Sequence, residues 1–324
     1  MNTQQTLEPK AKFDLHQHVT DRIIAALESG TAPWLKPWTN AGSHLALPRN
    51  AVSNRYYNGV NVLLLWLAAA EKGYRQSKWI TMKAANELGG HVRKGEKATL
   101  VVNYNPVEKE KLDKDGNVVV DDEGNPEMVH FAFIKTHYLF NIEQCENLPA
   151  QYYELDDKAE SEPEVQYREF AEIRQIIEGI DLKVEIKPSN RAYYRPSTDV
   201  VVMPEMKQFN SEADFYSVLL HEMTHATGHK NRLNREGITS GKAKFGNDIY
   251  AFEELVAEMG GAFLCAHLGF DTVPQNASYI ASWIKVLKED KRAIFRAAGK
   301  AREASDYMLD TLKVMQQYER HQAA

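Results

Sequence analysis

Apolar residues in the first 150 positions recur with two different spacings. In residues 14–29 they fall three or four positions apart, which predicts an amphipathic helix. Residues 58–71 are apolar almost throughout and predict a buried helix. Residues 129–140 are rich in β-branched and aromatic side chains and predict a strand. Together these elements predict an α+β domain over residues 1–150.

Two polar segments interrupt this pattern. Residues 109–127 contain the dipeptides Asp115-Gly116 and Glu123-Gly124, which are turn signals, and they predict an exposed hairpin. Residues 151–165 are acidic and include a proline, as is typical of a linker between domains.

A second α+β domain is predicted over residues 166–324. It opens with a helix at about 166–179, and strand-like segments follow at 182–187 and 198–203. Two helical segments come next, and residues 276–320 are largely helical in pattern. The expected fold is therefore α+β with two domains, the second having a small sheet followed by helices.

The first of the two helical segments contains the pattern H-E-x-x-H. His221 and His225 are four residues apart, so both imidazoles lie on one helix face and can reach the same ion. Glu222 stands where a carboxylate can take a proton from water. Ser211 resembles an N-cap and Gly228 falls where a C-terminal cap is expected, so the histidines lie inside a well-delimited helix. These residues predict a zinc site of the hydrolase type.

A zinc of this type needs a third protein ligand and an open position for water. Residues 251–268 predict a helix that is apolar or small nearly all round, yet Glu254 and Glu258 share one of its faces. Because a buried carboxylate is costly unless it is paired or coordinated, two of them favour a cation. We assign Glu254 as the third ligand and Glu258 as a residue that orients a ligand histidine. The exchanged roles remain an alternative, as does pairing of both glutamates with Arg or Lys.

His229 is a further candidate ligand, because it lies four residues after His225. Gly228 is expected to end the helix before it, so His229 ranks below Glu254.

Composition narrows the class of protein. The 324 residues are 43% apolar and carry a net charge of −6, so no overall basicity demands a nucleic acid partner. The two cysteines, Cys145 and Cys265, form no disulfide framework and fit a reducing cytoplasm. The N-terminus lacks an apolar signal core, and no apolar run is long enough to span a bilayer. We expect a cytoplasmic protein without membrane contact.

Within residues 1–150, cations alternate with aromatic side chains. Single-stranded nucleic acid is bound in this way, because cations follow the phosphates and rings stack on bases. The alternative is that the aromatic residues belong to the core. The candidate contacts are Trp34, Lys36, Trp38, Arg49, Arg55, Tyr57, Arg75, Lys78, Trp79, Arg93, Lys94 and Lys97.

Several longer motifs, in order along the chain, resemble the ArdC family of plasmid and phage antirestriction proteins. In the first domain the most distinctive is Tyr57-Asn58-Gly59-Val60-Asn61, and Asn58 and Asn61 join the candidate nucleic-acid contacts on this ground. In the second domain they are His221-Glu222 with His225, then Thr227-Gly228-His229, Arg232-Leu233-Asn234-Arg235 and Glu253-Glu254-Leu255-Val256-Ala257-Glu258.

The resemblance implies an N-terminal domain that binds single-stranded DNA and a zincin-like domain related to SprT-like and IrrE-like peptidases. It implies a carboxylate ligand on the helix after the H-E-x-x-H helix, in agreement with Glu254. It also implies a role in protecting incoming DNA from host restriction during conjugation. The expected cofactor is Zn²⁺, and the expected partners are single-stranded DNA and a protein substrate on that DNA, belonging to the host restriction machinery.

Three functional hypotheses follow. In the first, a DNA-associated metallopeptidase uses zinc on His221, His225 and Glu254, with Glu222 as general base. In the second, a DNA-binding protein protects DNA sterically and its zinc is structural or vestigial. The third is an intracellular zinc peptidase that does not bind DNA.

Overall fold

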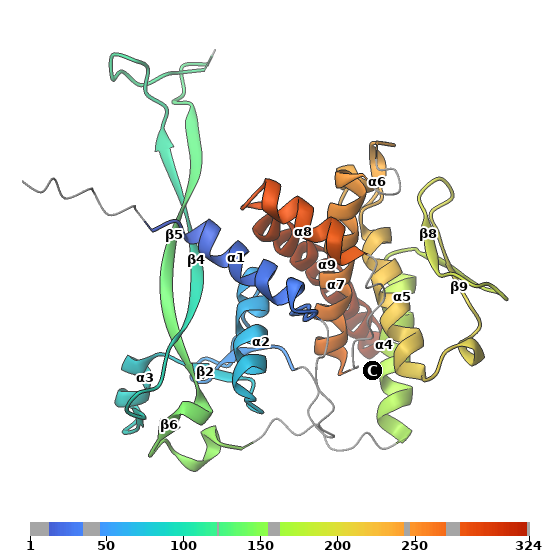
Figure 1. Cartoon of the computed structure of the whole chain (residues 1–324). Coiled ribbons are helices and arrows are strands. Elements are labelled where there is room, and N and C mark those ends of the chain that lie inside the picture. The colour runs from blue at the N-terminus through green and yellow to red at the C-terminus, as the bar shows by residue number, and fades with distance from the viewer. Residues whose placement is uncertain are drawn as a thin grey trace, which may run out of the picture.

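The computed structural model of the chain describes residues 13–34, 46–121, 123–154, 163–242, 247–269 and 279–322. The N-terminal half forms a sheet with helices beside it, and the helical C-terminal half lies against those helices (Figure 1). The elements of the first half are α1 (Leu15–Glu28), β1 (Arg49–Asn50), α2 (Val60–Lys72), β2 (Lys78–Ile80), α3 (Met82–Glu87), β3 (His91–Val92), β4 (Thr99–Glu110), β5 (Met128–Asn141), η1 (Ile142–Gln144), β6 (Cys145–Glu146) and η2 (Ala150–Tyr152).

Strands β4 and β5 form the longest feature of the N-terminal half. They pair antiparallel from Thr99 opposite Leu139 to Glu110 opposite Met128, and β2 and β1 extend the sheet at one end in the order β1-β2-β5-β4. The far end projects beyond the helices as a two-stranded ribbon (Figure 1). The predicted hairpin 109–127 lies at the tip of this ribbon, where turns with glycine at positive φ match the turn signals.

The C-terminal half contains a small sheet and a group of helices. The three-stranded sheet has the order β7-β9-β8, so β8 is an edge strand. The elements are α4 (Pro163–Gly179), β7 (Lys183–Ile186), β8 (Tyr193–Arg195), β9 (Val200–Met203), η3 (Met206–Gln208), α5 (Glu212–Thr227), α6 (Glu236–Thr239), α7 (Asp248–Leu268), α8 (Ile280–Glu289) and α9 (Ala293–Gln322).

Capping residues mark the beginning and end of helices α5 and α7. The Ser211 side chain accepts a hydrogen bond from the Asp214 backbone at the start of α5, and Gly228 follows its last residue, as predicted. Asn247 caps α7 in the same way, and Gly269 ends it with φ at +89°. These caps set the first and last residues of each helix.

The two halves of the chain share one hydrophobic core. Apolar side chains of α1 and α2 pack in a single cluster with those of α7, α8 and α9. The Trp66 ring of α2 lies 5.9 Å from the Phe263 ring of α7, and Trp34 lies 5.5 Å from Trp283 of α8. Helical periodicity predicted that α2 and α7 would be buried, but it cannot tell which distant segment covers each helix.

A second cluster joins α4, α5, β9 and the far side of α7. As a result α7 is enclosed on both sides, and most of its residues from Ala251 to Leu268 are buried. No helix among the described residues is long and apolar enough to cross a membrane.

Candidate metal centre and nucleic-acid contacts

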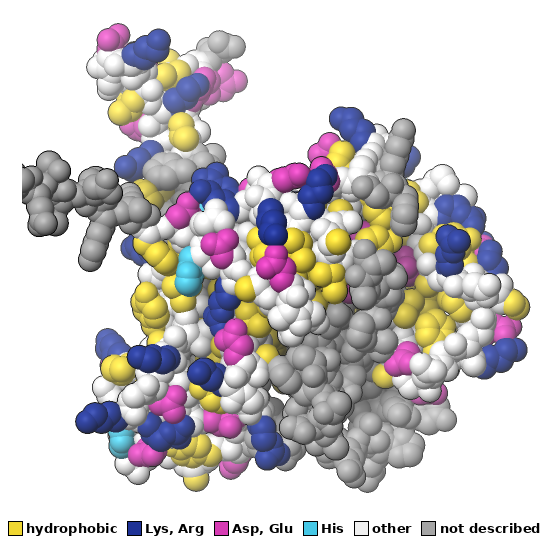
Figure 2. Space-filling model, viewed as in Figure 1, with side chains coloured by type: hydrophobic (Ala, Val, Ile, Leu, Met, Phe, Trp, Pro, Cys, Tyr) yellow, Lys and Arg dark blue, Asp and Glu magenta, His cyan; other side chains and the backbone are white. Residues whose placement is uncertain are grey.

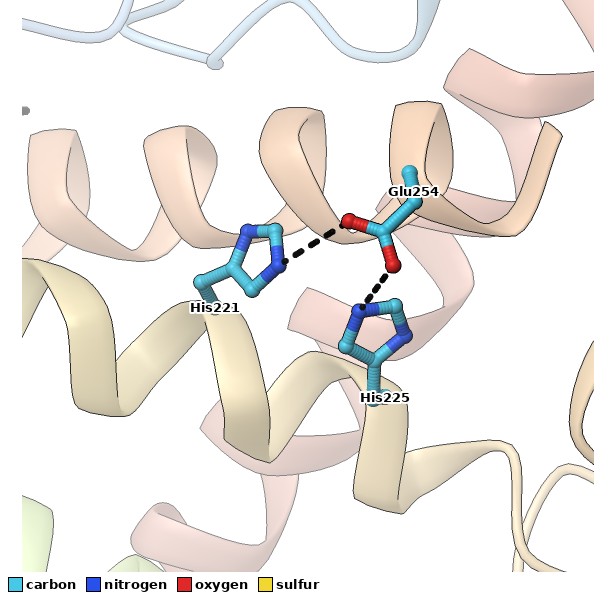
Figure 3. Close-up of side chains that lie close together, drawn as sticks. All are labelled: His221, His225 and Glu254. Carbon is cyan, nitrogen blue, oxygen red and sulfur yellow. Dashed lines mark ion pairs between the residues drawn. The ribbon is translucent and has the colours of Figure 1, made fainter. Parts of the chain in front are cut away.

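Three predicted ligands come together between α5 and α7. His221 and His225 lie one turn apart on α5, and Glu254 reaches them from α7 (Figure 3). The distance from Glu254 Oε2 to His221 Nε2 is 3.8 Å, and Glu254 Oε1 is 3.5 Å from His225 Nε2. All three residues are buried.

This donor set fits a divalent metal ion. Ligand bonds of about 2.1 Å at tetrahedral angles place two donor atoms about 3.3–3.5 Å apart. One nitrogen or oxygen from each residue lies within 4.8 Å of the others, so small side-chain rotations bring the three onto one ion. Two imidazoles and a carboxylate are the donors of a three-ligand site that keeps a fourth position open.

Glu258 occupies a different place from Glu254. Its Oε1 lies 4.0 Å from His221 Nδ1, the ring nitrogen on the side away from Glu254. The geometry therefore favours Glu254 as the ligand and places Glu258 behind His221.

Two glycines allow α7 to approach α5 this closely. A Cβ on Gly260 would stand 2.5 Å from Thr224 Cγ2, and one on Gly261 would stand 3.3 Å from the His221 Cα. Any side chain at these two positions would therefore collide with α5 or crowd it.

Burial and mutual charge shift the pKa values at the centre. Burial raises the pKa of Glu222 to about 7. Burial and the neighbouring His225 lower the pKa of His221 to about 3. Burial disfavours the charged form of His225, but the Glu254 carboxylate outweighs it and raises the His225 pKa to about 10. Burial opposes ionisation of Glu254, yet the His225 charge lowers its pKa to about 2. A Glu222 that titrates near neutrality suits a general base.

Glu253 was missed by the sequence analysis. Its Oε1 lies 3.4 Å from His225 Nδ1, and the Arg235 guanidinium bonds the same carboxylate at 2.7 Å. Both residues lie in the motifs that resemble the ArdC family, but the helix pattern gave Glu253 no reason to be singled out. The presence of both residues in these motifs was the one signal that the sequence offered.

The centre opens onto a cleft with a cavity volume of about 1120 Å³. Tyr193 and Tyr194 on the edge strand β8 line the cleft, where a tyrosine hydroxyl could stabilise an oxyanion. The hydroxyl of Tyr194 donates to Asp199 at 2.7 Å. Tyr250 also lines the cleft; its hydroxyl lies 3.0 Å from that of Tyr279, and it hydrogen-bonds to the Glu254 carboxylate. Tyr250 therefore joins the candidates for contact with a substrate.

His229 lies just beyond the end of α5. Its Nδ1 is 3.6 Å from the Asp199 carboxylate, and it is absent from the group of side chains that can share an ion. This position agrees with the prediction that His229 is a weaker candidate ligand than Glu254.

Two of the predicted nucleic-acid contacts are core residues instead. The side chains of Trp34 and Trp79 are 0% and 1% exposed, so neither can stack on a base in this conformation. Trp34 packs on Trp283, and Trp79 packs with the Tyr74 ring. For these two residues the alternative interpretation holds, because their large apolar area is buried in the core.

Lys78 and Asn61 also have structural roles that replace the predicted contacts. Lys78 is 9% exposed, and its Nζ donates to the Glu154 carbonyl at 2.6 Å. The Asn61 amide donates to the Val102 carbonyl at 2.7 Å and accepts from the Val102 N–H at 2.8 Å. Asn61 thus satisfies the free edge of β4 as another strand would.

The remaining predicted contacts keep accessible side chains or lie outside the described residues. Arg55, Asn58, Arg75, Lys94 and Lys97 are exposed. Arg49, Tyr57 and Arg93 are partly exposed; Arg93 pairs with Glu96 at 2.7 Å, and Arg49 bonds Asn54. Lys36 and Trp38 fall outside the described residues. Figure 2 shows Lys and Arg side chains interspersed with Asp and Glu over the end of the N-terminal half that holds α3 and β6.

The fold and the enclosed histidines and glutamates define the C-terminal half as a zincin-like metallopeptidase domain. The model of that family, described as zincin-like metallopeptidase, matches residues 171–300. The family model of the N-terminal domain of anti-restriction factor ArdC matches residues 13–140.

Curated relatives match nearly the whole chain. The chain is 38% identical to the uncharacterized protein y4eC of Sinorhizobium fredii over 311 residues, which cover 95% of both proteins. It is 35% identical to a DNA primase TraC of Escherichia coli over 94% of its own length but only 20% of the primase.

Solved structures agree. The metal-free crystal structure of antirestriction ArdC protein from the R388 plasmid has a TM-score of 0.72 and 39% identity, covering 93% of this chain and 98% of that one. The Mn(II)-bound structure of ArdC has a TM-score of 0.69 at 38% identity, with the same coverage. The chain belongs to the ArdC family of antirestriction proteins, and its fold is two-domain α+β.

Proposed function

We propose that this protein binds single-stranded DNA and uses a zinc site of the metallopeptidase type, and that it protects incoming DNA from host restriction during conjugation. The observation that carries the metallopeptidase part is the buried set of His221, His225 and Glu254, with Glu222 beside it at the base of an open cleft. Membership of the ArdC family supports the antirestriction part.

His221, His225 and Glu254 would hold the metal. When bound, a zinc ion acts as a Lewis acid that polarises a carbonyl and acidifies water. Glu222 accepts the proton of the attacking water and can return it to the leaving amine, because its carboxylate lies beside the three ligands in the same cleft. The edge strand β8 and the tyrosines of the cleft are the surfaces that a peptide would meet.

Glu222→Gln tests the catalytic part. The variant should bind one Zn²⁺ as wild type does, but cleavage should fall by about 10²–10⁴-fold because the proton acceptor is gone. We would follow fluorescein-labelled casein and the chain's own autolysis, with and without single-stranded oligonucleotide. Unchanged cleavage in this variant would contradict the mechanism.

The same variant separates the peptidase from the steric hypothesis. Plasmid transfer would be scored into a restricting recipient and into a non-restricting one, with a plasmid that encodes wild type or Glu222→Gln. If peptidase activity protects the DNA, Glu222→Gln loses protection only in the restricting recipient. Full protection by Glu222→Gln would support protection by DNA binding alone.

DNA binding is proposed for the N-terminal half, through exposed cations such as Lys94 and Lys97. We would measure fluorescence anisotropy of the full chain with matched single-stranded and duplex oligonucleotides across a salt series. Lys94→Glu with Lys97→Glu should weaken binding and reduce the salt slope by about 1.4, since each phosphate contact contributes about 0.7.

A matched double charge reversal in the other half is the control. Lys183 and Lys207 have side chains 67% and 79% exposed, so Lys183→Glu with Lys207→Glu changes the net charge equally. Equal losses in both double variants would indicate a nonspecific effect of charge. If wild type binds neither oligonucleotide at any salt concentration, a zinc peptidase without DNA binding becomes the better hypothesis.

A further inference from the structure

Arg235 and Glu253 form a buried ion pair directly behind the candidate metal centre. The two residues are 5% and 4% exposed. Arg235 Nη2 lies 2.7 Å from Glu253 Oε1, and Arg235 Nε lies 3.1 and 3.2 Å from the two carboxylate oxygens. Such a forked contact fixes the plane of the carboxylate as well as its position.

The carboxylate held in this way faces a proposed metal ligand. Glu253 Oε1 is 3.4 Å from His225 Nδ1, on the side of the ring opposite Glu254. An ionised carboxylate can only accept a hydrogen bond, so in the neutral imidazole that binds a metal Nδ1 carries the proton and Nε2 keeps its lone pair. Nε2 is the nitrogen that points toward Glu254.

Arg235 also holds the backbone that carries His225. Its Nη2 donates to the Thr224 carbonyl at 2.6 Å and lies 3.4 Å from the His225 carbonyl. Its Nη1 donates to the Thr227 hydroxyl at 2.6 Å. The guanidinium therefore binds the last turn of α5 and, through Glu253, the first half of α7.

The chain leaves room for this pair at two glycines. A Cβ on Gly237 would stand 2.8 Å from both Cβ and Oε2 of Glu253. A Cβ on Gly228 would stand 3.0 Å from Arg235 Nη2. Backbone therefore passes close to both charged side chains and leaves them little room to move.

His221, the other proposed ligand histidine, has no carboxylate held against its ring in this way. Glu258 Oε1 is 4.0 Å from His221 Nδ1, and this nitrogen has no hydrogen-bond partner among the described residues. The two ligand histidines are therefore held differently.

We propose that Arg235 and Glu253 are positioning residues that set the tautomer and ring orientation of His225 for metal binding. The proposal rests on the proposed metal site. Residues that orient a ligand histidine in this way typically change metal affinity by about 10–100-fold when they are altered.

The test measures Zn²⁺ affinity of the full chain by competition with a chromophoric chelator, and the visible spectrum of the Co²⁺-loaded protein. Glu253→Gln keeps the side-chain size but cannot force the proton onto Nδ1. We expect Zn²⁺ binding about 10–100-fold weaker and a changed Co²⁺ spectrum.

A second variant separates positioning from folding, because Glu253→Gln leaves Arg235 buried without its ion pair. Removing both charges in Arg235→Met with Glu253→Met avoids that penalty and restores stability. Positioning predicts that this stable double variant still binds Zn²⁺ about 10–100-fold more weakly. If the pair has only a structural role, the double variant should have the Zn²⁺ affinity and the Co²⁺ spectrum of wild type.

The chain offers a matched control at the same end of α5. Arg232 is a second arginine with a buried side chain; it donates to the Ala226 carbonyl at 2.8 Å and pairs with Asp199. This pair touches none of the three proposed ligands, so Arg232→Met with Asp199→Asn should lower stability but leave Zn²⁺ affinity within about 3-fold, well below the change expected from a residue that orients a ligand.

The outcomes distinguish this proposal from the proposed function. If wild type binds Zn²⁺ and both Glu253 variants bind it equally well, the positioning role is wrong and the metal site stands. If wild type and every variant fail to bind Zn²⁺ or Co²⁺, the metal site is wrong, and the positioning role is overturned with it.

Discussion

The surroundings of α7 and the ribbon of β4 and β5 are opposite kinds of structure. Helix α7 is covered on one side by helices from both halves of the chain and on the other by α5. The ribbon is held mainly by pairing between its own two strands, and side chains such as Phe133 and Tyr138 are more than half exposed. The packing around α7 holds side-chain atoms in fixed positions, whereas the ribbon exposes its side chains to solvent.

The contrast explains where chemistry can occur. A metal site needs donor atoms held to within a fraction of an ångström, which packed helices provide and an exposed ribbon does not. The buried charges of His225 with Glu254 and of Arg235 with Glu253 are tolerated because each faces an opposite charge. An extended surface suits contact with a flexible partner, where precise placement matters less.

The largest expected effect comes from the core that both halves share. Phe263→Ala removes a side chain that is 5% exposed and packs on Trp66, and should lower the free energy of unfolding by about 3–5 kcal/mol. Both halves should lose protection together in hydrogen exchange. Tyr318→Ala, at a site 62% exposed on α9, is the control and should change little. Loss of protection in only one half would show that the halves are independent.

A smaller effect is expected from pH. Without metal, the raised pKa values of Glu222 at about 7, Glu258 at about 8 and His225 at about 10 mean that the folded state keeps protons that the unfolded state loses. Above pH of about 6.5, stability therefore falls as pH rises. Metal binding requires a neutral His225 and so releases a proton, which makes binding tighter at higher pH.

The increase in Tm caused by Zn²⁺ should consequently be larger at about pH 8.5 than at about pH 6.5. To measure this increase, we would record Tm in the presence of chelator and in the presence of saturating Zn²⁺ at both pH values. An equal or smaller increase at the higher pH would contradict the assignment of His225 as a ligand.

The smallest effect should follow from shortening the ribbon. Replacing residues 110–128 by Asn-Gly joins β4 to β5 with a favoured turn and removes a tip whose side chains are mostly exposed. The free energy of unfolding should change by no more than about 0.5 kcal/mol, as for surface changes elsewhere, and Zn²⁺ affinity should be unchanged. A drop in Tm of several degrees would show that the ribbon supports the body after all.

The sequence predicted the candidate site better than it predicted the surface. Local signals locate α5 and place His221 and His225 on one face, and an acidic stripe on an apolar helix points to Glu254. The Arg235–Glu253 pair joins residues from different elements, so no local period reveals it. Trp34 and Trp79 could be read as surface or core, because an aromatic residue beside a lysine occurs in both.

The common core was the least predictable feature, because residues 151–165 have the composition of a linker while the packing crosses between the halves. Cutting the chain there would therefore yield complementary fragments, each presenting half of an apolar interface in which Trp66 meets Phe263. Such fragments should remain associated after a proteolytic nick and aggregate when expressed apart. The match to one DNA primase TraC, which spans 94% of this chain and 20% of that primase, likewise keeps both halves together.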